Sequence, residues 1–247
     1  MSKETDSDDE PQQLQFKVII LGDGAVGKTS IAMRHTEDNF SNMYKQTIGL
    51  DFFLKRLALP AWSAFRADVL AAGDTQVTLQ IWDIGGQSIG GKMLKNYIFG
   101  AQGVLLVYDI TNYESFQNLE DWYRLVRRTF ADAPMPYVAL VANKSTMFCL
   151  ERSSPDLTHL RAVKAAKHKQ FVEENDLKSY LVSAKTGDQV NTAFRQIAAD
   201  LAGVALTKTD LDVETPVLKA QIINHEQNDP DVKTPDIRAP SKGCSLQ

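Results

Sequence analysis

The sequence has few cysteines, no long apolar run and no basic cluster. Only two cysteines, Cys149 and Cys244, occur in 247 residues, which excludes a disulfide framework and fits a reducing cytosolic setting. No apolar run approaches the ~20 residues that a membrane-spanning helix needs, and the polar, acidic N-terminus lacks the pattern of a signal peptide. The histidines show no metal-ligand spacing and are expected on the surface or in loops: His35, His159, His168 and His225.

The charge balance excludes nucleic acid as a partner, because the formal net charge is −4 and the basic residues are scattered. Apolar residues make up 43% of the chain and charged residues 23%, as in an ordinary globular protein. We expect a disordered acidic arm over residues 1–13, a single domain over 14–205 and a flexible tail over 206–247, where proline and polar residues accumulate.

Strand-like and helix-like apolar patterns alternate along the predicted domain. Continuous apolar runs predict buried strands, and runs with apolar residues three or four apart predict helices. This alternation predicts an α/β fold with a mostly parallel sheet and helices on both faces. The expected strands are 16–21, 51–59, 77–82, 103–110, 137–142 and 179–182, and the expected helices are 29–36, 114–130, 162–175 and 188–202.

The segment from Gly22 to Thr29, Gly-Asp-Gly-Ala-Val-Gly-Lys-Thr, matches the pattern of a phosphate-binding loop between a strand and a helix. Its backbone N–H groups can surround phosphates, Lys28 can supply a positive charge, and Thr29 can supply a hydroxyl to Mg²⁺. The helix that follows adds its N-terminal dipole to the same anion site. The predicted phosphate contacts are Gly22, Asp23, Gly24, Ala25, Val26, Gly27, Lys28, Thr29 and Ser30.

A second candidate segment begins where the strand 77–82 ends. Asp83 stands at that end and is expected to hold Mg²⁺ through water. Gly86 leaves its N–H free to approach a γ-phosphate, and Gln87 is the candidate residue for orienting the attacking water. Without the phosphate loop, these residues would equally fit a strand-ending Asp before an ordinary turn.

With these motifs the chain resembles a Ras-superfamily small GTPase of the Rab type. Residues 46–52 resemble its first switch segment, in which Thr47 would contact Mg²⁺ and the γ-phosphate, and residues 79–87 resemble the second. Ile84-Gly85 replaces the usual Thr-Ala, which is similar to a divergent, singly prenylated branch, the Rab twenty-eight subgroup. The resemblance implies a six-stranded P-loop GTPase fold, GTP or GDP with Mg²⁺ as ligands, and a monomer.

The guanine-reading motif of that family, Asn-Lys-x-Asp, is interrupted here. Asn143 and Lys144 are followed by Thr146 where the Asp should stand, and removing residues 146–155 would bring Asp156 into register. These residues therefore resemble an insertion into the base pocket. Ser183, Ala184 and Lys185 resemble the remaining guanine-contact motif.

A second interruption separates the strands 51–59 and 77–82, which should pair as antiparallel neighbours. Removing residues 61–72 would leave a short hairpin loop. A longer hairpin connection should cost well under ~2 kcal/mol, because loop-closure entropy grows slowly with length. We expect this insertion to be tolerated, whereas the insertion at 146–155 threatens a ligand contact.

The chain ends in Cys244-Ser-Leu-Gln247, which matches a prenylation signal that favours a farnesyl group on Cys244. One prenyl chain without a basic cluster anchors a protein weakly. We therefore expect the protein to bind the cytoplasmic face of membranes and to exchange with the cytosol.

Three functions remain open on the sequence alone. The first is a GTP-hydrolysing switch in membrane traffic, whose exchange factor, GTPase-activating protein (GAP) and effectors bind the two switch segments. The second is an interaction protein that keeps the fold but binds guanine nucleotide poorly because of the 146–155 insertion. A P-loop ATPase or small-molecule kinase fits less well, because Thr47, Asp83 and the motif at Ser183 would then be coincidences.

Overall fold

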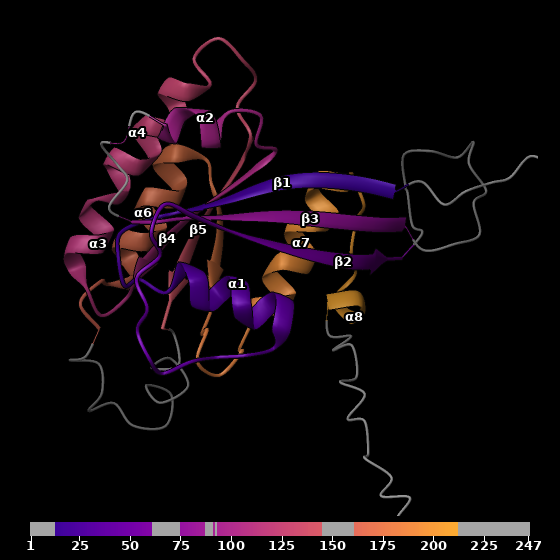
Figure 1. The fold of residues 1–247 in the computed structure, drawn as a ribbon, viewed down its shortest axis with the longest axis horizontal. Coiled ribbons are helices and arrows are strands. Elements are labelled where there is room, and N and C mark those ends of the chain that lie inside the picture. Colours follow the sequence, from indigo (N-terminus) through magenta and orange to yellow (C-terminus); the bar gives the residue numbers. More distant parts are fainter. Residues whose placement is uncertain (1–12, 61–74, 87–90, 92, 145–160, 212–247) are drawn as a thin grey trace, which may run out of the picture. The chain divides into compact units, whose positions relative to one another are not determined.

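A six-stranded sheet in the order β2-β3-β1-β4-β5-β6 organises the chain (Figure 1). The computed structural model describes residues 13–60, 75–86, 91, 93–144 and 161–211. Only the β2–β3 pair is antiparallel, and the other neighbours run parallel. The predicted α/β fold class is confirmed. The strands are β1 (Gln13–Leu21), β2 (Leu50–Leu59), β3 (Thr75–Ile84), β4 (Gly103–Asp109), β5 (Tyr137–Asn143) and β6 (Lys178–Leu181).

Helices cover both faces of the sheet (Figure 1). Side chains of α1 and α7 pack on one face, and those of α2, α3, α4 and α6 pack on the other. Within the described residues, no helix is long and apolar enough to cross a membrane. The helices are α1 (Lys28–Glu37), α2 (Leu94–Ile98), α3 (Tyr113–Gln117), α4 (Leu119–Thr129), α6 (Ala165–Asn175), α7 (Val190–Ala202) and α8 (Lys208–Leu211).

The central strands are buried on both faces, as the continuous apolar runs predicted. Val18 and Ile20 of β1 point into the cluster under α1 and α7, while Ile19 and Leu21 point into the opposite one. Successive strand side chains alternate between faces, so a parallel strand with helices on both sides must be apolar throughout. The phosphate loop begins at the carboxyl end of one of these buried strands, β1, so the core fixes its starting position.

The predicted hairpin partners are confirmed as antiparallel neighbours. β2 and β3 pair continuously from Leu50 opposite Ile84 to Leu59 opposite Thr75. The proposed insertion at 61–72 lies outside the described residues. The pairing includes every residue of β2 and β3.

The single helix expected over 114–130 is interrupted, and two helices, α3 and α4, meet at Asn118. The apolar pattern could not reveal the interruption, because Phe116, Leu119 and Trp122 all face the same core cluster on either side of it. The side chain of Asn118 instead donates a hydrogen bond to Asp23 in the phosphate loop.

The expectation of surface histidines is wrong for His35 and His168, which are 2% and 7% exposed. His35 stacks on Phe194 of α7 at 4.1 Å between ring centroids, and its Nδ1 lies 2.9 Å from Asn191 Oδ1. His168 lies between the hydroxyls of Tyr108 and Ser179. Single-residue polarity misled the prediction, because each ring completes the apolar face of its helix. His159 and His225 lie outside the described residues.

Burial of His35 predicts a loss of stability in acid. Desolvation lowers the pKa of its imidazole from 6.5 to about 4, so below pH 6.5 the unfolded chain binds a proton that the folded chain does not. The contribution of the neutral imidazole to the free energy of unfolding is complete above pH 6.5. This contribution decreases as the pH falls, by about 2 kcal/mol between pH 7 and pH 5. We expect urea unfolding of H35Q to show a correspondingly smaller drop over this interval. An identical drop in both proteins would contradict the assignment.

Candidate functional site

The phosphate loop lies between β1 and α1 and is shaped by its glycines. Gly27 has a φ of 94°, a left-handed conformation that side chains disfavour. A Cβ atom at this position would lie 2.3 Å from the amide nitrogen of Asn143, which approaches from β5. Glycine at position 27 therefore satisfies both the turn and the close approach of the neighbouring strand.

Lys28, the first residue of α1, is enclosed by the loop that precedes it. It is 6% exposed, and its Nζ donates hydrogen bonds to the carbonyl oxygens of Gly22 at 2.8 Å and Asp23 at 2.7 Å. Burial lowers the pKa of the ammonium to about 8, against the opposing attraction of the Asp83 and Asp23 carboxylates. The loop thus holds a desolvated positive charge at the start of a helix.

Three oxygen-bearing side chains meet beside this lysine. The Thr29 hydroxyl lies 2.5 Å from Asp83 Oδ2 and 2.7 Å from the Thr47 hydroxyl, and Thr47 lies 3.4 Å from the same carboxylate oxygen. Asp83 is fully buried, and its Oδ1 has no hydrogen-bond partner within the described residues. Burial raises the pKa of this carboxyl group, while the bond from Thr29 opposes the rise.

This cluster fits Mg²⁺ in its chemistry. Magnesium prefers hard oxygen donors, and it keeps several water molecules that need acceptors nearby. A buried carboxylate oxygen without a partner is such an acceptor, because leaving it unsatisfied is costly. Nowhere in the described part of the chain do three or more His, Cys, Asp or Glu side chains form a group that could hold a metal ion, so the proposed donors here are one carboxylate and two hydroxyls.

Asn143 joins the phosphate loop to the loop after β6. Its Nδ2 donates to the carbonyl of Val26 at 2.8 Å, and its Oδ1 accepts a hydrogen bond from the backbone N–H of Ala184 at 3.1 Å. Asn143 is 2% exposed, and Ser183 and Ala184 are also buried. The structure thus brings together two of the motifs that the sequence placed far apart.

Arg34 of α1 supports the same region and was missed by sequence reasoning. Its Nε donates to the carbonyl of Ala184 and its Nη2 to that of Lys185, each at 3.0 Å. An arginine on a surface helix carries no signal that distinguishes such a role from solvent exposure. Its contacts span 150 residues of sequence, so only the tertiary structure could identify them.

The second switch segment reaches the phosphate loop through Gly86. A Cβ at Gly86 would lie 2.2 Å from the backbone nitrogen of Gly24, so only glycine permits this contact. The preceding Gly85 N–H donates to the carbonyl of Gly49 in the first switch segment at 2.9 Å. Gln87, the predicted water-orienting residue, lies outside the described residues.

The described segments on either side of residues 145–160 both lie near the carboxyl end of β5. Lys144 has a φ of 67° and pairs with the carboxylate of Asp109. After the undescribed residues 145–160, the backbone N–H groups of Ala162 and Val163 both donate to the carbonyl of Ile110. Ile110 N–H in turn donates to the Asn143 carbonyl. Asp156 lies outside the described residues.

These groups line one cavity of about 1170 Å³. It extends from the phosphate loop and Lys28 past Thr47 to Asn143, Lys144 and Ala184. Its volume is that of a binding site for a sizeable small molecule. The predicted residues Gly24, Ala25, Gly27, Thr29, Ser30, Gly86 and Lys185 also line it, while Gly22, Asp23, Val26, Asp83 and Ser183 lie around it in the contacts described above.

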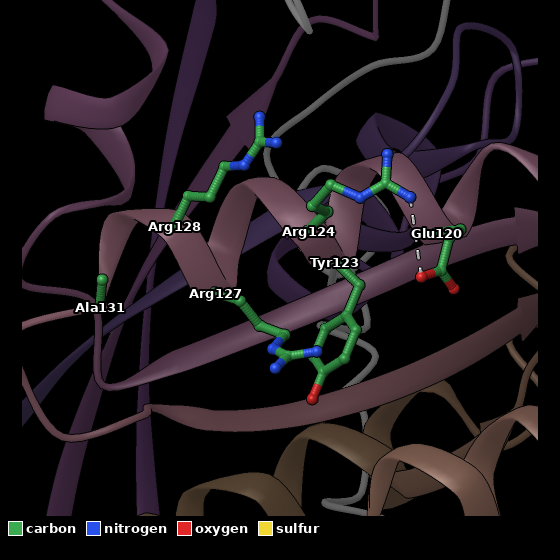
Figure 2. Close-up of a pocket in the computed structure, with 6 residues that line it drawn as sticks. All are labelled: Glu120, Tyr123, Arg124, Arg127, Arg128 and Ala131. Atoms are coloured by element: carbon green, nitrogen blue, oxygen red, sulfur yellow. Dashed lines mark ion pairs between the residues drawn. The ribbon is translucent and has the colours of Figure 1, made fainter.

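A smaller hollow of about 400 Å³ lies on the outer surface of α4 (Figure 2). Arg124 is paired there with Glu120 and Asp121, and Arg127 lies over the ring of Tyr123 at 5.9 Å. Within the described residues this hollow contains neither a glycine-rich loop nor a buried polar group without a partner. The cavity at the phosphate loop is therefore the candidate functional site.

A parallel α/β sheet, a glycine-rich loop before a helix, and a buried lysine beside an Asp–Thr cluster define a P-loop nucleotide-binding protein. The sequence profile of the Ras family matches residues 17–202. The chain therefore belongs to the Ras family of small GTPases, and its similarities place it in the Rab type.

The chain is similar to several curated Rab proteins. It is 38% identical to Ras-related protein Rab-28 of Caenorhabditis elegans over 221 residues, which cover 89% of this chain and 80% of that one. It is 33% identical to Rab-5A of Dictyostelium discoideum over 78% of this chain and 84% of that one. Rab-13 of Bos taurus is 31% identical, over 75% and 79% of the two chains.

Proposed function

We propose that this chain is a guanine-nucleotide switch that binds GTP and GDP with Mg²⁺ and hydrolyses GTP slowly. Ras-family proteins in general bind guanine nucleotide with Mg²⁺ and hydrolyse GTP. The observation that carries the proposal is the junction of Thr29, Thr47 and the unpartnered Oδ1 of Asp83 beside Lys28. Residues from the phosphate loop and both switch segments meet there, as an Mg²⁺-dependent switch requires.

Lys28 would exchange its bonds to the loop carbonyls for bonds to the β- and γ-phosphates. Burial lowers the pKa of its ammonium group to about 8. A bound phosphate would raise this pKa, because a nearby opposite charge favours the charged form. Mg²⁺ would supply charge neutralisation between the phosphates. Thr29 and Thr47 would donate hydroxyl oxygens to it, and Asp83 would accept hydrogen bonds from its water molecules.

The base would lie at the other end of the cavity. Asn143 has a second amide N–H besides the one given to Val26, and it would donate to the base N7. The Ala184 N–H already reaches Asn143 Oδ1, and its position suits a contact with the guanine O6. Lys144, Ser183 and Lys185 would complete this end, with Asp156 as the proposed acceptor for the base.

Hydrolysis would release the two switch segments. The γ-phosphate and Mg²⁺ would hold Thr47 and Gly86, and Gln87 would orient the attacking water. The proposed roles contain no strong base, so turnover should be slow and should depend on a GAP that supplies an arginine. Exchange factors and effectors would bind the same segments, and the Rab-type relatives support a role in membrane traffic.

A nucleotide-binding-impaired interaction protein is the second candidate. The described residues at the base end of the cavity are Asn143, Lys144, Ala184, Lys185 and Thr186, and none of them is a carboxylate. Reading guanine requires an acceptor for its N1–H and exocyclic amine. The segment that would supply it begins after Lys144 and ends before Arg161, and it contains residues 146–155.

Competition binding tests the proposed function. We expect GTP and GDP, but not ATP, to displace a fluorescent guanine nucleotide from the purified chain, and chelation of Mg²⁺ to accelerate GDP release. Single-turnover GTP hydrolysis should be slow, and Q87L should slow it further without weakening GTP binding. Equal displacement by ATP would favour an ATPase or kinase, and failure of the fluorescent guanine nucleotide to bind would favour the interaction protein.

Deleting residues 146–155 tests whether the insertion impairs the base pocket. The deletion restores the sequence Asn143-Lys-Ser-Asp156 in register, so a carboxylate can accept both guanine donors. We expect GDP affinity to rise more than tenfold, which is about 1.4 kcal/mol. A parallel deletion of residues 61–72 is the matched control, because it shortens a loop at a hairpin tip and should leave affinity unchanged. A gain below tenfold in the first variant would identify the insertion as a tolerated loop.

The C-terminal motif supports a proposed farnesyl anchor on Cys244, which lies outside the described residues. A single prenyl chain gives weak, reversible attachment, so the protein should partition between the cytoplasmic face of membranes and the cytosol. We expect C244S to lose its membrane fraction in cell fractionation. The control is S245A, which keeps the cysteine four residues from the end. Persistence of C244S on membranes would place the anchor elsewhere.

A further inference from the structure

An acidic side chain stands inside the loop that should bind phosphate. Asp23 is the second residue of the phosphate loop, and both of its carboxylate oxygens are bonded away from the lysine. Oδ2 accepts a hydrogen bond from Asn118 Nδ2 at 2.6 Å, and Oδ1 accepts one from Trp122 Nε1 at 2.9 Å. We call these three residues the Asp23 clasp.

The two donors are anchored on the helical layer opposite α1. Trp122 is fully buried in the core cluster beneath α4, so its indole N–H has a fixed position. Asn118 lies at the junction of α3 and α4, where its side chain bridges 95 residues of sequence to reach the loop. The clasp therefore joins the phosphate loop to the packed core rather than to another surface loop.

The backbone of Asp23 contacts two groups on which the proposed switch depends. Its carbonyl accepts a hydrogen bond from Lys28 Nζ at 2.7 Å. The Cα of Gly86 approaches so closely that a Cβ there would lie 2.3 Å from the Asp23 carbonyl carbon. A shift of Asp23 would therefore move the lysine and the surface on which the second switch segment rests.

We propose that Asn118 and Trp122 are positioning residues that hold the Asp23 carboxylate away from the bound phosphates and thereby slow nucleotide release. The inference rests on the proposed function, because it assigns a role in retaining that nucleotide. A carboxylate repels phosphate oxygens of like charge. Neutral N–H donors can satisfy this carboxylate without an ion pair, and they also fix the direction in which it points.

A double-mutant cycle on GDP dissociation tests the proposal. W122F keeps an aromatic ring but removes the N–H donor to Asp23 together with part of the buried indole volume, so the carboxylate is free to turn. We expect GDP to dissociate about tenfold faster, in line with the loss of one hydrogen bond to a charged group. Adding D23A to W122F should slow dissociation again, because the repelling charge is gone. N118A provides a second route to the same effect outside the buried core.

The matched control is Y137F at the amino end of β5, the end opposite to the phosphate loop. It removes a hydroxyl that bonds to Tyr180 at 2.8 Å and to Asp200 at 3.0 Å, so it also deletes a partly buried hydrogen-bond donor. We expect Y137F to lower the unfolding midpoint while GDP dissociation stays within twofold of the unmodified chain. A similar acceleration in Y137F would reduce the clasp to a general stability effect.

Two kinetic outcomes would overturn the proposal. One is a dissociation rate within twofold of the unmodified chain in both W122F and N118A. The other is a D23A/W122F protein in which the two effects multiply, because independent effects mean that Trp122 does not act through Asp23.

Hydrogen exchange separates failure of the clasp from failure of the proposed function. If the unmodified chain binds no guanine nucleotide, the proposed function is wrong, and the clasp is then read from the amides of residues 22–27. Faster exchange at these amides in W122F and N118A, but not in Y137F, would retain the clasp as the element that orders the loop. Unchanged exchange would eliminate it as well.

Discussion

The two hydrogen bonds of the Asn143 side chain are the contacts on which the arrangement of the candidate site depends. One amide group holds Val26 of the phosphate loop and Ala184 of the loop after β6. Both loops begin at carboxyl ends of parallel strands, where a sheet fixes the directions in which chains leave. A buried amide can satisfy both only if β1, β5 and β6 keep their order. The position of Asn143 therefore depends on the order of the strands. Glycine at position 27 is required because a side chain there would collide with the Asn143 amide.

The fold was predictable because its signals are local. Continuous apolar runs marked the strands, and glycines followed by Lys28 and Thr29 marked the phosphate loop. The interruption at Asn118 and the burial of His35 were not predictable, because each depends on a residue brought from elsewhere, Asp23 in one case and Phe194 in the other. The contacts of Arg34 escaped for the same reason. Local periodicity indicates which face of an element is buried, but it does not indicate which distant residue a side chain on that face contacts.

Asp83 and Lys28 are ionisable groups whose charged forms are disfavoured by burial in the site. Burial raises the pKa of the Asp83 carboxyl and lowers that of the Lys28 ammonium, so both shifts favour the neutral forms. The partners that keep them charged are oxygen atoms of the loop, two threonine hydroxyls and each other's field. A cation and a polyphosphate together would relieve both penalties, because each ligand supplies the charge that one residue lacks. Stability of this region and ligand binding are therefore coupled.

Asp23 breaks the local logic of an anion-binding loop, and the structure resolves the conflict through tertiary contacts. Local conflicts of this kind concentrate at functional sites. The same residue accepts a hydrogen bond from Lys28 at its carbonyl and one from Trp122 at its carboxylate, so the phosphate loop is joined directly to the core beneath α4. At the base end, the described chain departs at Lys144 and resumes at Arg161, after which the N–H groups of Ala162 and Val163 donate to the carbonyl of Ile110. Phosphate contacts should therefore tolerate change at residues 146–155 better than base contacts do, because Asn118 and Trp122, and not the segment after Lys144, hold the Asp23 side chain.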